Sequence, residues 1–297
     1  MSNDSAVPSG VAPSGFRLPQ ATHLGRVSLR VSDLARSLTY YRDVLGLSLL
    51  GETAGRAVLG VAESGAELLE LVEAPGARAV PRHGLLGIYH FAVLLPDRAS
   101  LGRFLQHLAD IGARAGMSDH LVSEALYLQD PDNIGIEVYA DRPREGWTWR
   151  DGQLEMATNP LDTNDLLRAA AGKPWTGMPV GTTIGHVHLH VGDIPKATAF
   201  YHEGLGFDKM VWSYPGALFL AAGGYHHHLG TNTWAAQAPP ATPGDAGLHE
   251  WRVVVPTVSD VHAAAQSLAT AGYEIERDGD DALVRDPWGT RVRVTTP

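Results

Sequence analysis

The chain has 297 residues, which is long enough for two domains, and its 44% hydrophobic content is that of a globular protein with a sizeable core. Its formal net charge of -10 argues against nucleic acid or an anionic membrane as the main partner. The absence of cysteine excludes disulfides, thiolate metal sites and cysteine nucleophiles, and no apolar run approaches the roughly 20 residues of a membrane span. We therefore expect a soluble, cytoplasmic protein.

The first segment of the chain, residues 1–21, is rich in Ser, Pro and Gly. It has neither the basic start nor the apolar run of a signal peptide. We expect a flexible tail that packs in part on the body of the protein.

The sequence repeats itself. LGRVSLRVSDLARSLTYYRDVLGL (24–47) aligns without a gap with IGHVHLHVGDIPKATAFYHEGLGF (184–207), and segments 88–113 and 249–273 echo the pattern more weakly. Each copy reads as an alternating strand, an Asp N-cap, an amphipathic helix and a Leu-Gly stop, followed by short apolar runs. This predicts an α+β fold of four βαβββ modules.

The modules are expected to pair in chain order. Two would form a barrel-like domain over residues 22–143, and the other two a second domain over 183–297. Residues 144–182 do not repeat and are rich in Pro and Gly, so they predict a surface linker with a short helix over 162–171.

Histidines mark the second half. In GHVHLHVGD, His186, His188 and His190 alternate with apolar residues and should share one face of a strand. A solvated strand surface is the simpler explanation for such a row. A second cluster in YHHHLG changes the balance, because alternation there puts His226 and His228 on one face and His227 on the other.

Matching the modules places Glu250 where His90 stands in the second module. His186, His228 and Glu250 then occupy equivalent inward positions and form the predicted metal ligands. Two imidazoles and one carboxylate suit Fe(II) or Mn(II) and leave coordination positions open, whereas a closed zinc site commonly uses four ligands.

The motifs HVHLHVGDI…FYHEGLGF, YHHHLGTNTW and DHLVSEALYLQDPDNIGIEVYADRP resemble those of the vicinal oxygen chelate superfamily, in particular its two-domain catechol 2,3-dioxygenase-like group. The resemblance covers roughly residues 22–297. It implies an Fe(II)-dependent extradiol cleavage of a catechol-like diol by O2, which needs a base for the diol proton. His226 and His188 are the predicted bases, because each lies two residues from a predicted ligand.

The chain departs from the better-known pattern of that group, in which two histidines open the two modules of the catalytic domain and a glutamate lies on the final strand. Arg293 stands at the final-strand position of the second half. In the first half His90 and Glu137 match the pattern, but Arg26 replaces the first histidine and should pair with Glu137 or Glu70. We expect no metal in that half.

Three functions remain open: the extradiol dioxygenase with Fe(II), Mn(II) or another divalent metal; a glyoxalase-type metal-dependent isomerase; and a metal-free small-molecule binding protein. The scaffold alone cannot decide among them. The expected partners are a small aromatic substrate and O2, with no nucleic acid and no membrane, and a homo-oligomer is left open.

Overall fold

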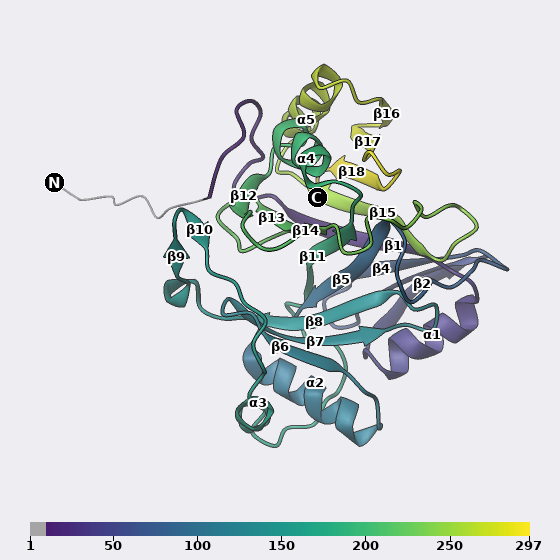
Figure 1. Cartoon of the computed structure of the whole chain (residues 1–297). Helices are drawn as coiled ribbons and strands as arrows, with labels where there is room; N and C mark the ends of the chain where they lie inside the picture. The colour runs from purple at the N-terminus through teal and green to yellow at the C-terminus, as the bar shows by residue number, and fades with distance from the viewer. Residues whose placement is uncertain (1–9) are drawn as a thin grey trace.

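The computed structural model of the chain describes residues 10–297 (Figure 1). It confirms the α+β class and the four modules, each of which runs strand, helix, three strands. The first module contains β1 (His23–Val31), α1 (Leu34–Asp43), β2 (Ser48–Thr53), β3 (Arg56–Val61) and β4 (Ala66–Glu73). The second contains β5 (Gly87–Leu94), α2 (Arg98–Asp110), β6 (Gly116–Asp119), β7 (Ser123–Gln129) and β8 (Gly135–Asp141).

The second half repeats this order after the linker. The linker contains η1 (Arg144–Gly146), β9 (Trp149–Arg150), β10 (Gln153–Leu154) and α3 (Thr163–Ala169). The third module contains β11 (Thr183–His190), α4 (Ile194–Ala197), the π-helical segment η2 (Thr198–Gly204), β12 (Asp208–Val211), β13 (Ala217–Ala221) and β14 (Leu229–Asn232). The fourth contains β15 (Gly247–Val254), α5 (Val258–Thr270), β16 (Ile275–Asp278), β17 (Asp281–Arg285) and β18 (Arg291–Thr295).

The modules do not pair in chain order. One eight-stranded sheet has the order β16-β17-β18-β15-β1-β4-β3-β2 and joins the first module to the fourth; we call it the 1–4 sheet. The other has the order β12-β13-β14-β11-β5-β8-β7-β6 and joins the second module to the third; we call it the 2–3 sheet. The expected pairing within each half is therefore corrected, because each sheet takes one module from each half.

The junction strands explain why alternation could not reveal this pairing. β1 runs antiparallel to β15 with Val27 opposite Trp251, and β11 runs antiparallel to β5 with Val187 opposite Phe91. All four side chains are fully buried. The first strand of each module has the same apolar face, and one of its edges is left unpaired by its own module. Pairing with a module of the same half or of the other half would therefore bury equivalent apolar surface.

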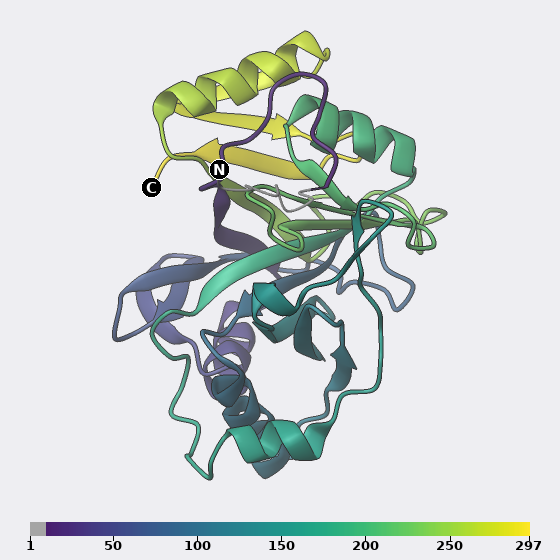
Figure 2. The ribbon, with the colours of Figure 1, turned by 90° about the vertical axis from the view of Figure 1, so that its left-hand side faces the viewer.

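The local predictions hold. The apolar faces of β1 and β11 are fully buried, and Asp33 and Asp193 cap the following helices by accepting the backbone N–H of the residue three positions on. In the linker helix Asp162 is the N-cap rather than part of the body. Figure 2 shows α5 and the α4–η2 helix at one end of the molecule and α2 and α3 at the opposite end.

The segment before β1 packs on the third module. Val11 bridges to Lys209, Arg17 forms an ion pair with the buried Asp208, and Leu18 is buried. The rest of the predicted tail, residues 1–9, lies outside the described residues. No helix between residues 10 and 297 is both long and apolar enough to cross a bilayer.

Candidate metal centre

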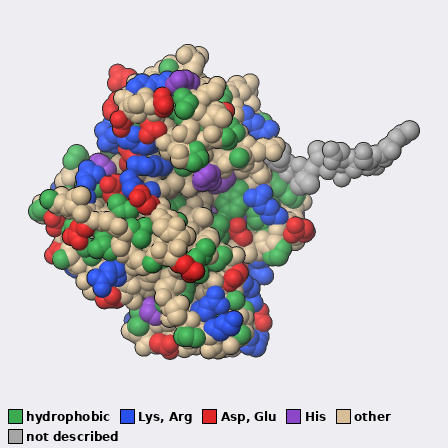
Figure 3. Space-filling model, turned by 180° about the vertical axis from the view of Figure 1, so that it is seen from behind, with side chains coloured by type: hydrophobic (Ala, Val, Ile, Leu, Met, Phe, Trp, Pro, Cys, Tyr) green, Lys and Arg blue, Asp and Glu red, His purple; other side chains and the backbone are tan. Residues whose placement is uncertain are grey.

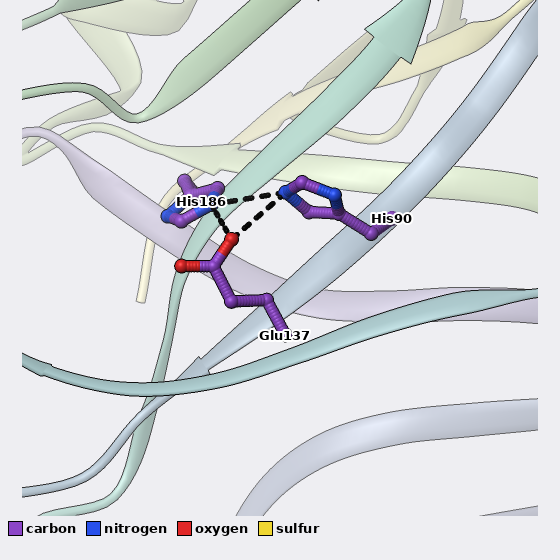
Figure 4. Close-up of side chains that lie close together, drawn as sticks. All are labelled: His90, Glu137 and His186. Atoms are coloured by element: carbon purple, nitrogen blue, oxygen red, sulfur yellow. Dashed lines mark hydrogen bonds and ion pairs between the residues drawn. The ribbon is translucent and has the colours of Figure 1, made fainter. Parts of the chain in front are cut away.

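Three buried side chains of the 2–3 sheet point toward one another: His90 from β5, Glu137 from β8 and His186 from β11 (Figure 4). Oε2 of Glu137 lies 3.0 Å from Nε2 of His90 and 3.1 Å from Nε2 of His186. The two Nε2 atoms are 3.3 Å apart. One ligand atom of each residue could therefore reach a single ion.

The strand register creates this cluster. His186 lies opposite Ala92 on β5, and Ala92 lies beside Glu137 on β8, so the three positions form one row across the sheet. His90 is two residues before Ala92 and shares its face. Ala92 has only a methyl group, so no bulky side chain stands between His186 and Glu137 in this row.

The electrostatics prepare the donors for a cation. Burial raises the pKa of Glu137, but the neighbouring His186 and His90 outweigh it and hold that pKa well below the usual range. Burial is also the main cause that lowers the pKa of His186 to about 4. At neutral pH the carboxylate is ionised and the His186 imidazole is neutral, as metal ligands must be.

Three further histidines, His188, His190 and His227, lie near the cluster. The ring centroid of His227 is 4.1 Å from that of His186, and burial lowers the pKa of His227 well below its usual value. His188 lies opposite His90 in the β5–β11 pair. Its Nε2 is 2.9 Å from the Nδ2 of Asn232, whose Oδ1 is 2.8 Å from Nδ1 of His190. Asn232 thus fixes the orientation of two of these rings.

A cavity of about 270 Å³ opens onto the cluster. His90, Glu137, His188 and His227 form part of its lining. On one wall Tyr127 Oη is 2.6 Å from Nε2 of His120. The remaining lining residues are uncharged: Tyr89, Ser118, Met156, Ala157, Thr158, Tyr214, Phe219 and Trp234.

Of the three predicted ligands, only His186 belongs to the cluster. Glu250 lies in the 1–4 sheet, where its Oε1 accepts a 2.7 Å bond from Nε of Arg293. His228 is buried away from the cavity, and its Nδ1 accepts the backbone N–H of Ala222 at 3.2 Å. The structure therefore does not bring His186, His228 and Glu250 together, because Glu250 and His186 belong to different sheets.

The predicted bases divide in the same way. His188 lines the cavity. His226 does not; it is fully buried and its Nε2 lies 2.8 Å from Oδ1 of Asp141. Strand alternation does not apply here because residues 222–228 form an irregular segment that contains two glycines with positive φ, and β14 begins only at Leu229. Of the three consecutive histidines, His226, His227 and His228, it is His227 that lines the cavity.

The first half of the chain, for which no metal was expected, supplies two of the three clustered residues. In the sequence, His90 and Glu137 match the metal-ligand positions of the resembled dioxygenase group. Pairing the modules in chain order, however, predicts Arg26 and not a histidine as the third residue beside them. In the structure Arg26 forms ion pairs with Glu67 and Glu70, at 2.5 and 3.8 Å, and His186 takes the third position instead.

Comparison with known proteins agrees with this architecture. The family model described as "Glyoxalase/Bleomycin resistance protein/Dioxygenase superfamily" matches residues 23–138 and 183–297. The catechol-2,3-dioxygenase of Bacillus subtilis (strain 168) is 45% identical over 270 residues, which cover 90% of this chain and 94% of that protein.

Solved structures resemble the fold at low sequence identity. A protein from Bacillus subtilis subsp. subtilis str. 168, described only as a candidate dioxygenase, has a TM-score of 0.64 at 13% identity and covers 95% of this chain and 87% of its own. Glyoxalase I from Zea mays has a TM-score of 0.55 at 18% identity, with 92% of each chain covered.

Proposed function

Since the chain belongs to the glyoxalase/bleomycin resistance protein/dioxygenase superfamily, we propose that it is a non-haem Fe(II)-dependent extradiol dioxygenase that cleaves a catechol-like aromatic diol. The observation that carries this proposal is the His90–Glu137–His186 cluster at an aromatic-lined cavity. The 45% identity to a catechol-2,3-dioxygenase supports the reaction type.

The cluster fits a divalent iron ion. Two imidazoles and one carboxylate form the facial set typical of non-haem Fe(II) oxygenases, which leaves coordination positions for further ligands. His186 Nδ1 is buried without a hydrogen-bond partner among the described residues, and Nε2 is the nitrogen that faces Glu137 and His90. When bound, the metal would acidify the diol, hold the diol and O2 side by side and accept developing charge.

The cavity suits a flat, uncharged ring. Tyr89, Phe219 and Trp234 provide aromatic surfaces, and no Lys or Arg lines the space. An acidic substituent on the ring would therefore find no cationic partner there and would have to be desolvated. We expect unsubstituted or alkyl-substituted catechols to be better substrates than carboxylated ones.

The chain offers a base for the diol proton. His227 lies against His186 and lines the cavity, so its imidazole is positioned to accept the proton. His188 borders the same space on the other side. Tyr127, hydrogen-bonded to His120, presents a hydroxyl beside Glu137 and would orient an oxygen atom of the bound diol.

The test is oxygen uptake with a catechol. Metal-free protein is loaded with Fe(II) without air and then mixed with catechol and air-saturated buffer, while O2 is followed with an electrode and the product by its yellow colour. We expect one O2 consumed per catechol and a ring-opened product. Stoichiometric metal without oxygen uptake on several catechols would reject the dioxygenase and favour the isomerase.

A further inference from the structure

The 1–4 sheet contains a cavity of its own. It has a volume of about 230 Å³ and lies at the β1–β15 junction, where Arg30, Leu248 and His249 line it. Arg30 of β1 stands opposite Gly247 there, as His190 of β11 stands opposite Gly87 in the 2–3 sheet. The cavity is thus the counterpart of the space beside the candidate metal centre. Seen from behind, basic side chains (blue) and acidic side chains (red) lie close together on the left of the molecule (Figure 3).

Basic side chains surround this cavity. Arg30, Arg285, Arg291 and His249 line it, and no Asp or Glu does. Within residues 10–297 neither Arg30 nor Arg285 forms an ion pair, and the guanidinium of Arg291 lies 3.7 Å from Glu250.

Arg30 and Arg285 donate to backbone carbonyl groups and not to carboxylates. Arg30 donates to the backbone carbonyls of Asp245 and Thr242, both at 3.2 Å, and Nη1 of Arg285 donates to that of Gly289 at 3.2 Å. Burial lowers the pKa of Arg30, and although Asp245 opposes this effect, Arg285 adds to it. Cations gathered in a partly dry space repel one another, and an anion between them would remove that cost.

Apolar side chains also line the cavity, among them Ile88, Leu248 and Trp288. From this combination we propose that the cavity binds a small organic oxyanion, whose carboxylate or phosphate group pairs with Arg30 and Arg285 and whose body rests on Trp288. Planar guanidinium groups bind both kinds of oxyanion in a bidentate manner. The site is separate from the candidate metal centre and would hold an effector or a second ligand.

Two probes distinguish the chemistries: inorganic phosphate and succinate. Each is titrated into the protein at constant ionic strength set with NaCl, and binding is followed by calorimetry and by the thermal midpoint. We expect saturable binding of at least one probe, with the midpoint rising as RT ln(1 + [L]/Kd) requires. The probe that binds more tightly identifies the group.

Variants locate the binding. Arg285 is the exposed last residue of β17, and Arg285→Gln should weaken binding by at least about tenfold; Arg30→Gln should do the same. Arg150→Gln removes the same charge from a side chain that is 76% exposed in the linker, and should bind as the original protein does. Glu137→Gln should also bind unchanged, which separates this proposal from the proposed function.

Binding of neither probe beyond the effect of NaCl would overturn the proposal. Equal binding by Arg285→Gln and Arg150→Gln would overturn it too, because the anion would then respond to general surface charge.

Discussion

His90 and His186 come from different halves of the chain, yet their Nε2 atoms lie 3.3 Å apart across the β5–β11 pair. Neither half alone carries the complete cluster, since His90 and Glu137 precede the linker and His186 follows it. The candidate centre therefore depends on the packing of the two halves against each other, and on the register of one antiparallel junction.

Ala92 controls the room available between the three donors. Replacing it with Leu should place a branched side chain in the middle of the row formed by His186, Ala92 and Glu137, and overpacking of this kind costs about 1–3 kcal/mol of stability. We expect Ala92→Leu to lose metal binding while remaining folded, as judged by metal content and circular dichroism. Ala92→Gly keeps the space open and should retain the metal; equal metal content in both variants would show that the ion lies elsewhere.

His228 should make the metal-free protein sensitive to acid. Burial lowers the pKa of His228 to about 3 in the folded protein, whereas the unfolded chain titrates near 6.5. Between these values the unfolded chain binds more protons, so the free energy of unfolding decreases as pH falls below about 6.5. At pH 5 this one group should cost about 2 kcal/mol relative to pH 7 and above.

Urea denaturation at pH 7 and pH 5 measures this effect. His228→Gln removes the titrating group and should reduce the loss of stability between the two pH values. His83→Gln, at an exposed position, serves as the matched control and should follow the original protein. An unchanged pH dependence in His228→Gln would contradict a buried, neutral imidazole.

Two tyrosines form equivalent hydrogen bonds between modules, one between the first and second modules and one between the third and fourth. Tyr41 Oη donates to Asp130 at 2.9 Å, and Tyr201 Oη donates to Asp286 at 2.7 Å; each aspartate also accepts backbone N–H groups of the turn before the last strand of its module. Removing one hydroxyl leaves a buried carboxylate short of a donor, which costs about 1–3 kcal/mol. Tyr41→Phe and Tyr201→Phe should each lower the free energy of unfolding by this amount, whereas Tyr214→Phe, a partly buried control, should change it by less.

Tyr127 should affect turnover more than metal binding. Its hydroxyl lies 2.6 Å from Nε2 of His120 and lines the cavity beside Glu137 without belonging to the cluster. Tyr127→Phe should lower kcat by about 100-fold, at the lower end of the range for a single positioned proton donor or acceptor, with metal content unchanged. Steady-state oxygen uptake measures this, and an unaltered kcat would remove Tyr127 from the proposed mechanism.

The sequence predicted the modules, their caps and the linker helix, because each of these depends on local periodicity and on short-range side-chain chemistry. The pairing of modules could not be predicted in this way. Val27 and Val187 present the same apolar face to Trp251 and Phe91, and nothing local to those residues says which module provides the partner strand.

The site predictions failed where they depended on that pairing or on regular strand geometry. His186 lies in the cluster with His90 and Glu137, whereas Glu250 lies in the other sheet and pairs with Arg293. His227 was placed on the wrong face because strand alternation was applied across an irregular turn. The match of His90 and Glu137 to the ligand positions of the resembled group was the signal that could have found the cluster.

The central claim is that His90, Glu137 and His186 hold the metal, and metal stoichiometry after Fe(II) loading tests it most directly. Glu137→Gln and Glu250→Gln remove the same charge from buried carboxylates in the two sheets. The account predicts about one iron per chain in Glu250→Gln and almost none in Glu137→Gln. Iron retained by Glu137→Gln and lost from Glu250→Gln would contradict it.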